Sequence, residues 1–198
     1  MAIAINGTGT ITGISVGGLN DSIITSSELA NAEVTTAKIA DNAVTSAKYV
    51  ISVAHITDTK AQGTHAGTFT NGAWRTRDLN TIEDDPDSIV TLSSNQFTLG
   101  AGTYLIEWSA PAIYVGRHQT RLYDVTGTTG LGLGSCEYSD LGSGSTDRSM
   151  GFDVVTLTAN NIFEIQHHCS TTRTTNGLGN YGNFTDEKYA MVTIFKLS

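Results

Sequence analysis

The sequence contains little of what marks several common classes of protein. Its two cysteines, Cys136 and Cys169, are too few for the disulfide framework of a small secreted domain. They could form one bridge, but we favour free buried thiols. No stretch approaches the ~18 consecutive apolar residues of a membrane-spanning helix. The opening residues, MAIAING, lack the basic segment and the apolar run of a secretory signal peptide. These absences predict a chain that folds in a cytoplasm and has no membrane partner.

Basic residues are also scarce. The chain has 11 lysines and arginines against 19 aspartates and glutamates, a formal net charge of −8. Nucleic-acid binding depends on clustered cations that neutralise phosphates, so this balance argues against a nucleic-acid partner. Glycine is abundant, with 21 copies among 198 residues, and the hydrophobic fraction of 39% suffices for one sizeable core. The composition favours short strands joined by turns.

Residues 21–50, DSIITSSELANAEVTTAKIADNAVTSAKYV, repeat a ten-residue pattern three times. The larger apolar side chains recur every five residues, at Ile24, Leu29, Val34, Ile39, Val44 and Tyr49. This spacing scatters them around a helix and alternates them between the two faces of a strand. Neither element buries them all against one partner, so we expect a thin stalk whose apolar groups are shielded by neighbouring copies of the chain. A disordered linker rich in Ala, Thr and Ser is the alternative.

The stalk separates a short N-terminal segment, residues 1–20, from a predicted head domain, residues 51–198. In the head, period-two alternation places Tyr104, Ile106 and Trp108 on one side of a strand. Strand-like runs recur about every ten residues without a helical segment between them, which predicts an all-β sandwich or jelly roll. The expected strands are residues 49–56, 88–94, 96–100, 103–115, 118–125, 132–139, 148–158, 161–171 and 188–197.

Two segments of the head resemble the family of complement globular heads and tumour necrosis factors. They are FTLGAGTYLIEWSAPA (residues 97–112) and the closing YAMVTIFKL (residues 189–197). The resemblance implies a ten-stranded jelly roll that packs as a tight homotrimer, with the last strand facing the trimer axis.

A second resemblance covers most of the chain. The repeat VTTAKIADNAVTSAKY (residues 34–49), followed by GTFTNGAWRTRDLNTI (residues 67–82), is similar to bacteriophage tail-fibre and receptor-binding proteins. That resemblance implies a virion protein made in the host cytoplasm. Its residues 1–20 would dock on another virion protein, and its trimeric β-rich tip would face outward.

These resemblances together lead us to expect a homotrimeric structural fibre or spike that attaches to a host surface glycan. Three linked sites would raise avidity although each contact is weak. The alternative is a capsid decoration fibre with a structural or generic adhesive role, and the location on tail, baseplate or capsid stays open. A small depolymerase tip is another rival. A cellular trimeric adhesin is disfavoured by the missing secretion signal.

Two sets of residues are candidates for contacts outside the protomer. The long, polar, glycine-rich loop 170–187 supplies the candidate glycan ligands Arg173, Tyr181, Asn183 and Phe184, because flat aromatics and amides suit sugars. Arginines near Trp74 suit sugars and anionic polymers too. Since that segment carries the fibre resemblance, we favour a trimer interface, with arginines that could pair with Asp78 or Asp124. The predicted interface residues are Trp74, Arg75, Arg77, Arg117, Arg121, Tyr189 and Phe195.

The motifs that could hold a metal are weaker. Asp84, Asp85 and Asp87 in EDDPD are candidate calcium ligands, but the motif lacks an EF-hand spacing and we favour a solvated acidic turn. Adjacent strand residues point to opposite faces, so His167 and His168 are not expected to chelate one ion. An ion on the trimer axis is the alternative there. We therefore predict no metal and no cofactor.

The sequence also lacks a recognisable catalytic motif. The glycine-rich GLGLGS (residues 130–135) could suggest a phosphate loop, but that site needs a following helix, and strands are expected on both sides. We interpret it as a turn. There is no nucleophile elbow, no helical histidine pair and no persuasive carboxylate pair for glycoside hydrolysis. We predict that the protein is not an enzyme.

Overall fold

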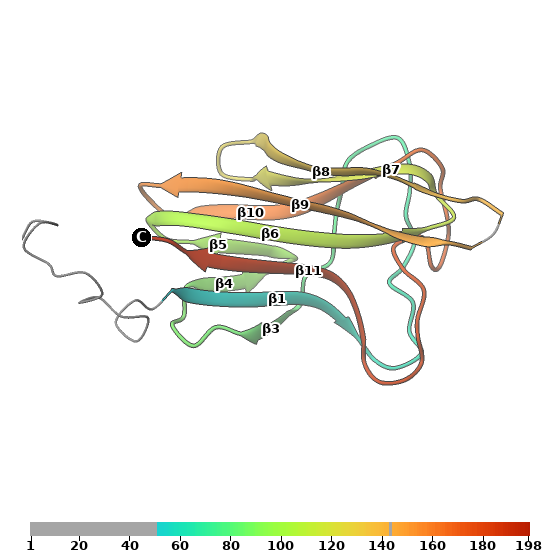
Figure 1. The fold of residues 1–198 in the computed structure, drawn as a ribbon, viewed down its shortest axis with the longest axis horizontal. Coiled ribbons are helices and arrows are strands. Elements are labelled where there is room, and N and C mark those ends of the chain that lie inside the picture. Colours follow the sequence, from blue (N-terminus) through green and yellow to red (C-terminus); the bar gives the residue numbers. More distant parts are fainter. Residues whose placement is uncertain (1–50, 143) are drawn as a thin grey trace, which may run out of the picture. The chain divides into compact units, whose positions relative to one another are not determined.

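The computed structural model describes residues 51–142 and 144–198. The predicted N-terminal anchor, residues 1–20, and the predicted stalk, residues 21–50, lie outside the described residues. Residues 51–198 form one compact unit. Its described residues contain antiparallel strands and no helix, as Figure 1 shows. The predicted all-β class is confirmed.

The strands form two sheets packed face to face as a jelly-roll-like sandwich (Figure 1). The five-stranded sheet has the order β3-β1-β11-β6-β9. Its strands are β1 (Ser52–Lys60), β3 (Thr81–Asp84), β6 (Gly102–Ile113), β9 (Thr146–Leu157) and β11 (Glu187–Lys196). The six-stranded sheet has the order β4-β5-β10-β7-β8, and β2 pairs with β10. Its strands are β2 (Arg75–Thr76), β4 (Val90–Ser93), β5 (Gln96–Leu99), β7 (Gly116–Asp124), β8 (Thr129–Ser139) and β10 (Asn161–Cys169).

Every expected strand has a counterpart, although the boundaries shift. Strand β1 runs to Lys60, beyond the expected end at residue 56, and residues 49–50 lie outside the described chain. Two further strands, β2 and β3, were not expected from the sequence. They span two and four residues, too short to show a periodic pattern of side chains.

The core lies between the two sheets. Tyr104, Ile106 and Trp108 of β6 are all buried there, which confirms the predicted alternation. The indole Nε1 of Trp108 donates a 2.8 Å hydrogen bond to Oγ1 of Thr120 on β7, so a polar contact ties the two sheets inside the core. Other core residues are Ala54, Ile56, Phe97, Leu99, Leu122, Phe163, Ile165, Val192 and Ile194.

The motif GLGLGS is part of strand β8, which corrects our interpretation of it as a turn. A Cβ at Gly134 would lie 2.2 Å from Oγ1 of Thr120, and one at Gly151 on β9 would lie 2.3 Å from the Trp108 ring. The Cα of Gly134 itself is 2.9 Å from that Cβ position at Gly151. These glycines therefore allow β8 and β9 to approach closely over the indole, a need for space that a local sequence pattern does not reveal.

The two ends of the sandwich differ. Ser52, at the start of β1, pairs with Lys196, at the end of β11, so the described chain begins and ends at one end of the sandwich. The long segments 61–74 and 170–186 lie at the opposite end, as Figure 1 shows. The two segments are joined there by backbone hydrogen bonds between Phe69 and Arg173 in both directions, each 2.9 Å.

Candidate binding surfaces

The outer face of the five-stranded sheet carries a row of apolar side chains that crosses four strands. The strand register places Val53, Phe195, Leu105 and Val154 side by side on β1, β11, β6 and β9. None of the four is fully buried in the protomer. A second row contains Met191, Ser109 and Met150. Because the outer face of such a sheet is normally polar, this apolar face marks a candidate contact surface.

Strand β9 shows the unusual pattern most clearly. Met150, Phe152 and Val154 point outward with 60%, 71% and 54% of their surface exposed. The alternate positions Gly151 and Asp153 point toward the other sheet. Larger apolar residues thus face outward where glycine and aspartate face inward, the reverse of the usual arrangement.

A shallow hollow of roughly 400 Å³ lies beside this strand on the same outer face. It is lined by residues of β1, β6 and β11 and by residues 150–152 of β9. His55, Thr193 and Glu107 share a register row on its floor, directly beside Phe152. The face therefore offers a ridge on its edge strand and a hollow next to that ridge.

The free edge of β9 is closed by side chains of the same chain. The backbone amide of Met150 donates to Oγ of Ser135 on β8 at 3.1 Å, and the backbone amide of Val154 donates to Oδ1 of Asp153 at 2.9 Å. With these backbone groups engaged, β9 is a poor template for adding a strand. Contacts through its apolar outer face are the remaining way to cover it.

The predicted interface residues lie in three different parts of the head domain. Phe195 lies on the apolar outer face, in the row with Val53 and Leu105. Arg77 and Tyr189 are buried within the protomer, so neither side chain is available to a partner subunit. The remaining predicted residues belong to the six-stranded sheet or to its margin: Trp74, Arg75, Arg117 and Arg121.

Arg77 is a structural residue at the loop end of the sandwich. Its guanidinium donates to the carbonyl oxygens of Pro111 at 3.2 Å and Leu178 at 2.8 Å. Burial lowers its pKa to about 10, and the charges of Asp58 and Asp78 oppose that shift. Asp78 was an expected partner of the arginines, but its carboxylate forms an ion pair with Lys60, 2.7 Å away. Its effect on Arg77 is that of a nearby charge.

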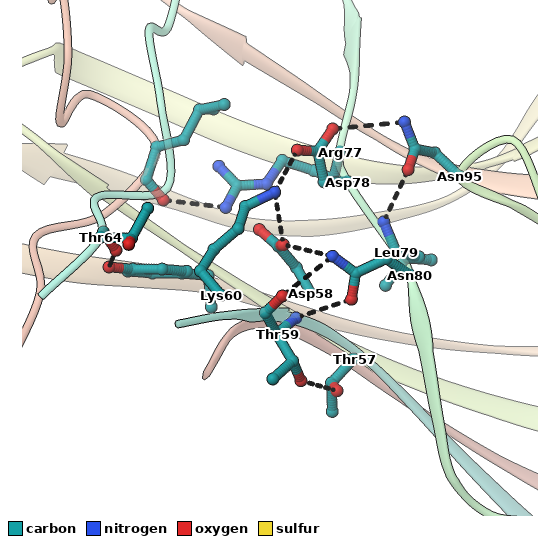
Figure 2. A network of polar contacts seen from close by, with 12 residues as sticks. Thr57, Asp58, Thr59, Lys60, Thr64, Arg77, Asp78, Leu79, Asn80 and Asn95 are labelled. Carbon is teal, nitrogen blue, oxygen red and sulfur yellow. Dashed lines mark hydrogen bonds and ion pairs between the residues drawn. The ribbon is translucent and has the colours of Figure 1, made fainter. Parts of the chain in front are cut away.

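Lys60 bridges two carboxylates beside Arg77, as Figure 2 shows. Its Nζ lies 3.0 Å from Oδ1 of the buried Asp58 in addition to its contact with Asp78. Asn80 Nδ2 also donates to Asp58, at 3.4 Å, and Asn95 Nδ2 donates to Asp78 at 3.2 Å. This network ties the segment before β3 to β1 and to the turn between β4 and β5.

His167 and His168 point to opposite sides of β10, as expected from their adjacency. His167 is fully buried and its Nε2 lies 3.0 Å from Nδ1 of His118, also buried. His168 instead contacts the indole of Trp74, with ring centroids 5.6 Å apart. Burial lowers the pKa of His118 to about 4. Burial and then the nearby charge of Arg77 lower the pKa of His167 well below its usual value.

The candidate glycan ligands in loop 170–187 occupy separate places. Arg173 lies over the Tyr114 ring, 4.5 Å from its centroid, and its Nε donates to Oδ1 of Asn176. Tyr181 contacts the ring of His65, with centroids 4.4 Å apart. Phe184 is 89% exposed. These contacts tie Arg173 and Tyr181 to different neighbours, and we do not assign the four residues to one site.

The carboxylate of Glu187 fixes the end of that loop. It accepts hydrogen bonds from the backbone amides of Gly182 at 2.8 Å, Asn183 at 2.7 Å and Gly63 at 3.1 Å. These bonds, led by the one from Gly182, lower the pKa of Glu187. Asn183 therefore contributes its backbone to the loop structure, with a positive φ of 61°.

The acidic turn has a structural role at Asp85. Both carboxylate oxygens of Asp85 accept backbone amides, from Ile89 at 2.8 Å and Val90 at 3.1 Å. Asp84 and Asp87 are exposed. Across residues 51–142 and 144–198, no three His, Cys, Asp or Glu side chains are grouped so that they could hold a metal ion. The same residues contain no helix long and apolar enough to cross a membrane.

The cysteines are free, as favoured, but their burial differs. Cys169 is buried, and burial raises the pKa of its thiol to about 11. Cys136 on β8 is exposed, which corrects the expectation of two buried thiols. It lies on the outer face of the six-stranded sheet, opposite Gln119 of β7.

Comparison with known proteins assigns no family to this chain. No protein-family model and no curated protein sequence matches this chain. Similar solved structures are jelly-roll domains of the tumour necrosis factor and complement C1q kind. They include murine APRIL (8% identity, 75% of this chain and 100% of that chain, TM-score 0.48), the zebrafish complement 1qA globular domain (16%, 75% and 98%, 0.47) and Eiger TNF from S. frugiperda (12%, 76% and 94%, 0.48). With TM-scores below 0.5 and identities of at most 16%, these three likenesses assign neither a family nor a function to the chain.

Proposed function

We propose that this chain is a trimeric fibre or spike protein of a bacteriophage virion, whose head domain self-associates and attaches the particle to its host. The observation that carries the self-association is the apolar outer face of the five-stranded sheet. Burying an exposed side chain such as Phe152 contributes roughly 1.5–3 kcal/mol, and each subunit would bury several. An uncovered face of this kind favours association between copies.

The ridge and the hollow lie side by side on one face, so copies of the chain can interlock through this face. Phe152 and Met150 form the ridge on the edge strand, and the hollow beside them is floored by His55, Thr193 and Glu107. A ridge on one copy that fits a hollow on the next makes a head-to-tail contact, which closes into a ring when the rotation permits. The resemblance to trimeric fibre tips sets our proposal at three copies.

The virion part of the proposal is supported by the sequence. The decapeptide repeat of residues 21–50 and the segment GTFTNGAWRTRDLNTI resemble phage fibre proteins. In a fibre, the end of the head that carries segments 61–74 and 170–186 would face the host, because the described chain begins at the opposite end. Host-surface glycan is the proposed target.

Labelling of intact particles tests this function. Antibodies raised against residues 51–198 would be applied to purified particles of the phage that encodes the chain and located by electron microscopy. Label on the tail or baseplate supports attachment, and label spread over the capsid supports the decoration-fibre alternative. Absence of label, with the chain also absent from particle proteins by mass spectrometry, would refute the virion assignment.

A further inference from the structure

The outer face of the six-stranded sheet contains a groove. It has a volume of about 680 Å³, within the range of small-ligand sites. Residues of β7, β8 and β10 line it, together with Trp74 just before β2. The lining residues are Trp74, Arg117, His118, Gln119, Cys136, Glu137, Tyr138, His168 and Ser170.

Aromatic side chains form two of its walls. Tyr138 is 57% exposed and lies in register with Arg117 on the neighbouring strand. Trp74 is held in place by the guanidinium of Arg121, 4.3 Å from its ring centroid, and by the ring of His168. A flat ring fixed in this way provides a rigid contact area for the apolar face of a sugar.

The groove also contains an exposed positive charge, although the chain has a net charge of −8. Arg117 is exposed, and among the described residues no hydrogen bond or ion pair engages its guanidinium. Arg121, which lies beside the groove against Trp74, donates to Oε1 of Gln166 at 2.8 and 2.6 Å, and Gln166 in turn donates to the Glu164 carboxylate. Glu137 is the one carboxylate among the lining residues, and it lies opposite the buried His118 on the neighbouring strand.

We propose that this groove binds a carboxylate-bearing saccharide, with Arg117 gripping the carboxylate and Tyr138 and Trp74 contacting the sugar rings. A guanidinium matches a carboxylate through two parallel hydrogen bonds. Gln119, whose Nε2 donates to the carbonyl oxygen of Gly134, adds its Oε1 as an uncharged acceptor for a hydroxyl. The choice of a saccharide rests on the attachment function proposed above. The acidic character rests on the charge of the groove itself.

The groove would remain accessible in the proposed assembly. It lies on the six-stranded sheet, whereas the apolar contact face lies on the other sheet of the sandwich. Three copies would therefore present three grooves, and linked sites of modest individual affinity give strong overall attachment.

Cys136 offers a direct readout of occupancy, because it is exposed and lines the groove while Cys169 is buried. The rate of maleimide alkylation of the full-length chain would be measured with increasing concentrations of a short oligogalacturonide. The same oligomer with its carboxylates methyl-esterified is the matched ligand control. The variant C136S confirms which thiol reacts, and isothermal calorimetry provides an independent affinity.

We expect the acidic oligomer to slow alkylation saturably and the methyl ester to leave it unchanged. R117Q should weaken binding about tenfold, since it removes a charge-assisted pair. Y138A should weaken binding as well. Both side chains are exposed, so neither change should impair folding. K188Q, which removes another exposed positive charge, on β11 and paired there with Glu83, should bind as the wild type does.

Three results would overturn the inference: no protection by the acidic oligomer, equal protection by its ester, or binding unaffected by R117Q. If the groove does not bind the acidic oligomer while particles carry the antibody label described above, this inference fails and the virion function stands. If the groove binds while particles lack the chain, the virion function fails and the binding site stands.

Discussion

Phe152 of edge strand β9 lies directly opposite Glu107 of β6 on the outer face of the five-stranded sheet. The aromatic ring is exposed in the protomer, and Glu107 lies on the floor of the hollow beside it. The large apolar ring of Phe152 therefore lies next to the polar floor of the hollow, which a neighbouring copy of the chain would cover.

Replacing Phe152 with aspartate should dissociate the assembly. The change removes roughly 1.5–3 kcal/mol of burial from each subunit contact and adds a charge to the apolar surface. Light scattering on residues 51–198 should report a monomer for F152D.

Phe184 provides the matched control for that experiment, because it is an equally apolar and even more exposed residue on loop 170–187. F184D should leave the assembly intact. Dissociation by both variants, or by neither, would argue against the five-stranded sheet as the contact face.

Replacing Arg77 with methionine should destabilise the head without touching its outer surface. The buried carbonyl groups of Pro111 and Leu178 would lose their donor, and Asp58 would lose a neighbouring positive charge. We expect a loss of about 3 kcal/mol or more in the free energy of unfolding, measured by urea denaturation. R75M, which changes an exposed arginine two residues away, should stay within about 0.5 kcal/mol of wild type. Equal effects of the two changes would contradict a structural role for Arg77.

Replacing Gly151 with alanine tests the close approach of β8 and β9. The added Cβ would lie 2.3 Å from the Trp108 ring, so the core must shift to accept it. Overpacking of this kind costs about 1–3 kcal/mol. G142A, in an exposed turn where the nearest atom is 3.5 Å away, is the control and should be nearly neutral. Thermal unfolding of both variants would show whether the predicted difference exists.

The buried His118–His167 pair should make the head less stable in mild acid. An unfolded histidine takes up its proton near pH 6.5, whereas burial lowers the pKa of His118 to about 4 and that of His167 further below its usual value. The unfolded state therefore binds more protons, so stability is fully present above pH 6.5 and falls progressively as the pH drops toward about 4.

Urea midpoints measured across that range would show this slope, and H118N, whose amide can replace the Nδ1 contact, should reduce it. A flat profile for the wild type would mean that the two imidazoles are not held neutral in the fold.

Much of the fold was predictable because it depends on local alternation. The alternating apolar residues Tyr104, Ile106 and Trp108 predict a half-buried strand. The other expected strands of the head were predicted from similar runs of strand-forming residues. Alternation does not say which face is buried. On β9 it would place Phe152 inside, whereas the indole of Trp108 fills that space and leaves room only for Gly151.

The candidate surfaces depend on pairings between distant segments, which a single sequence does not specify. The apolar row joins β1, β6, β9 and β11, and the groove joins Trp74 to residues near 118, 137 and 168. The sequence showed that arginines lie near Trp74, but it left open whether these residues contact sugars or a neighbouring subunit. Only the register showed that these residues and Phe195 belong to different sheets.

Self-association through the apolar face would be tested first by the mass of residues 51–198 in solution, measured by light scattering at micromolar concentration. We expect three times the mass of the fragment, just as the full-length chain should reach three times its 20.9 kDa. A fragment that stays monomeric, whether or not the full-length chain associates, would contradict self-association through the apolar face of the head.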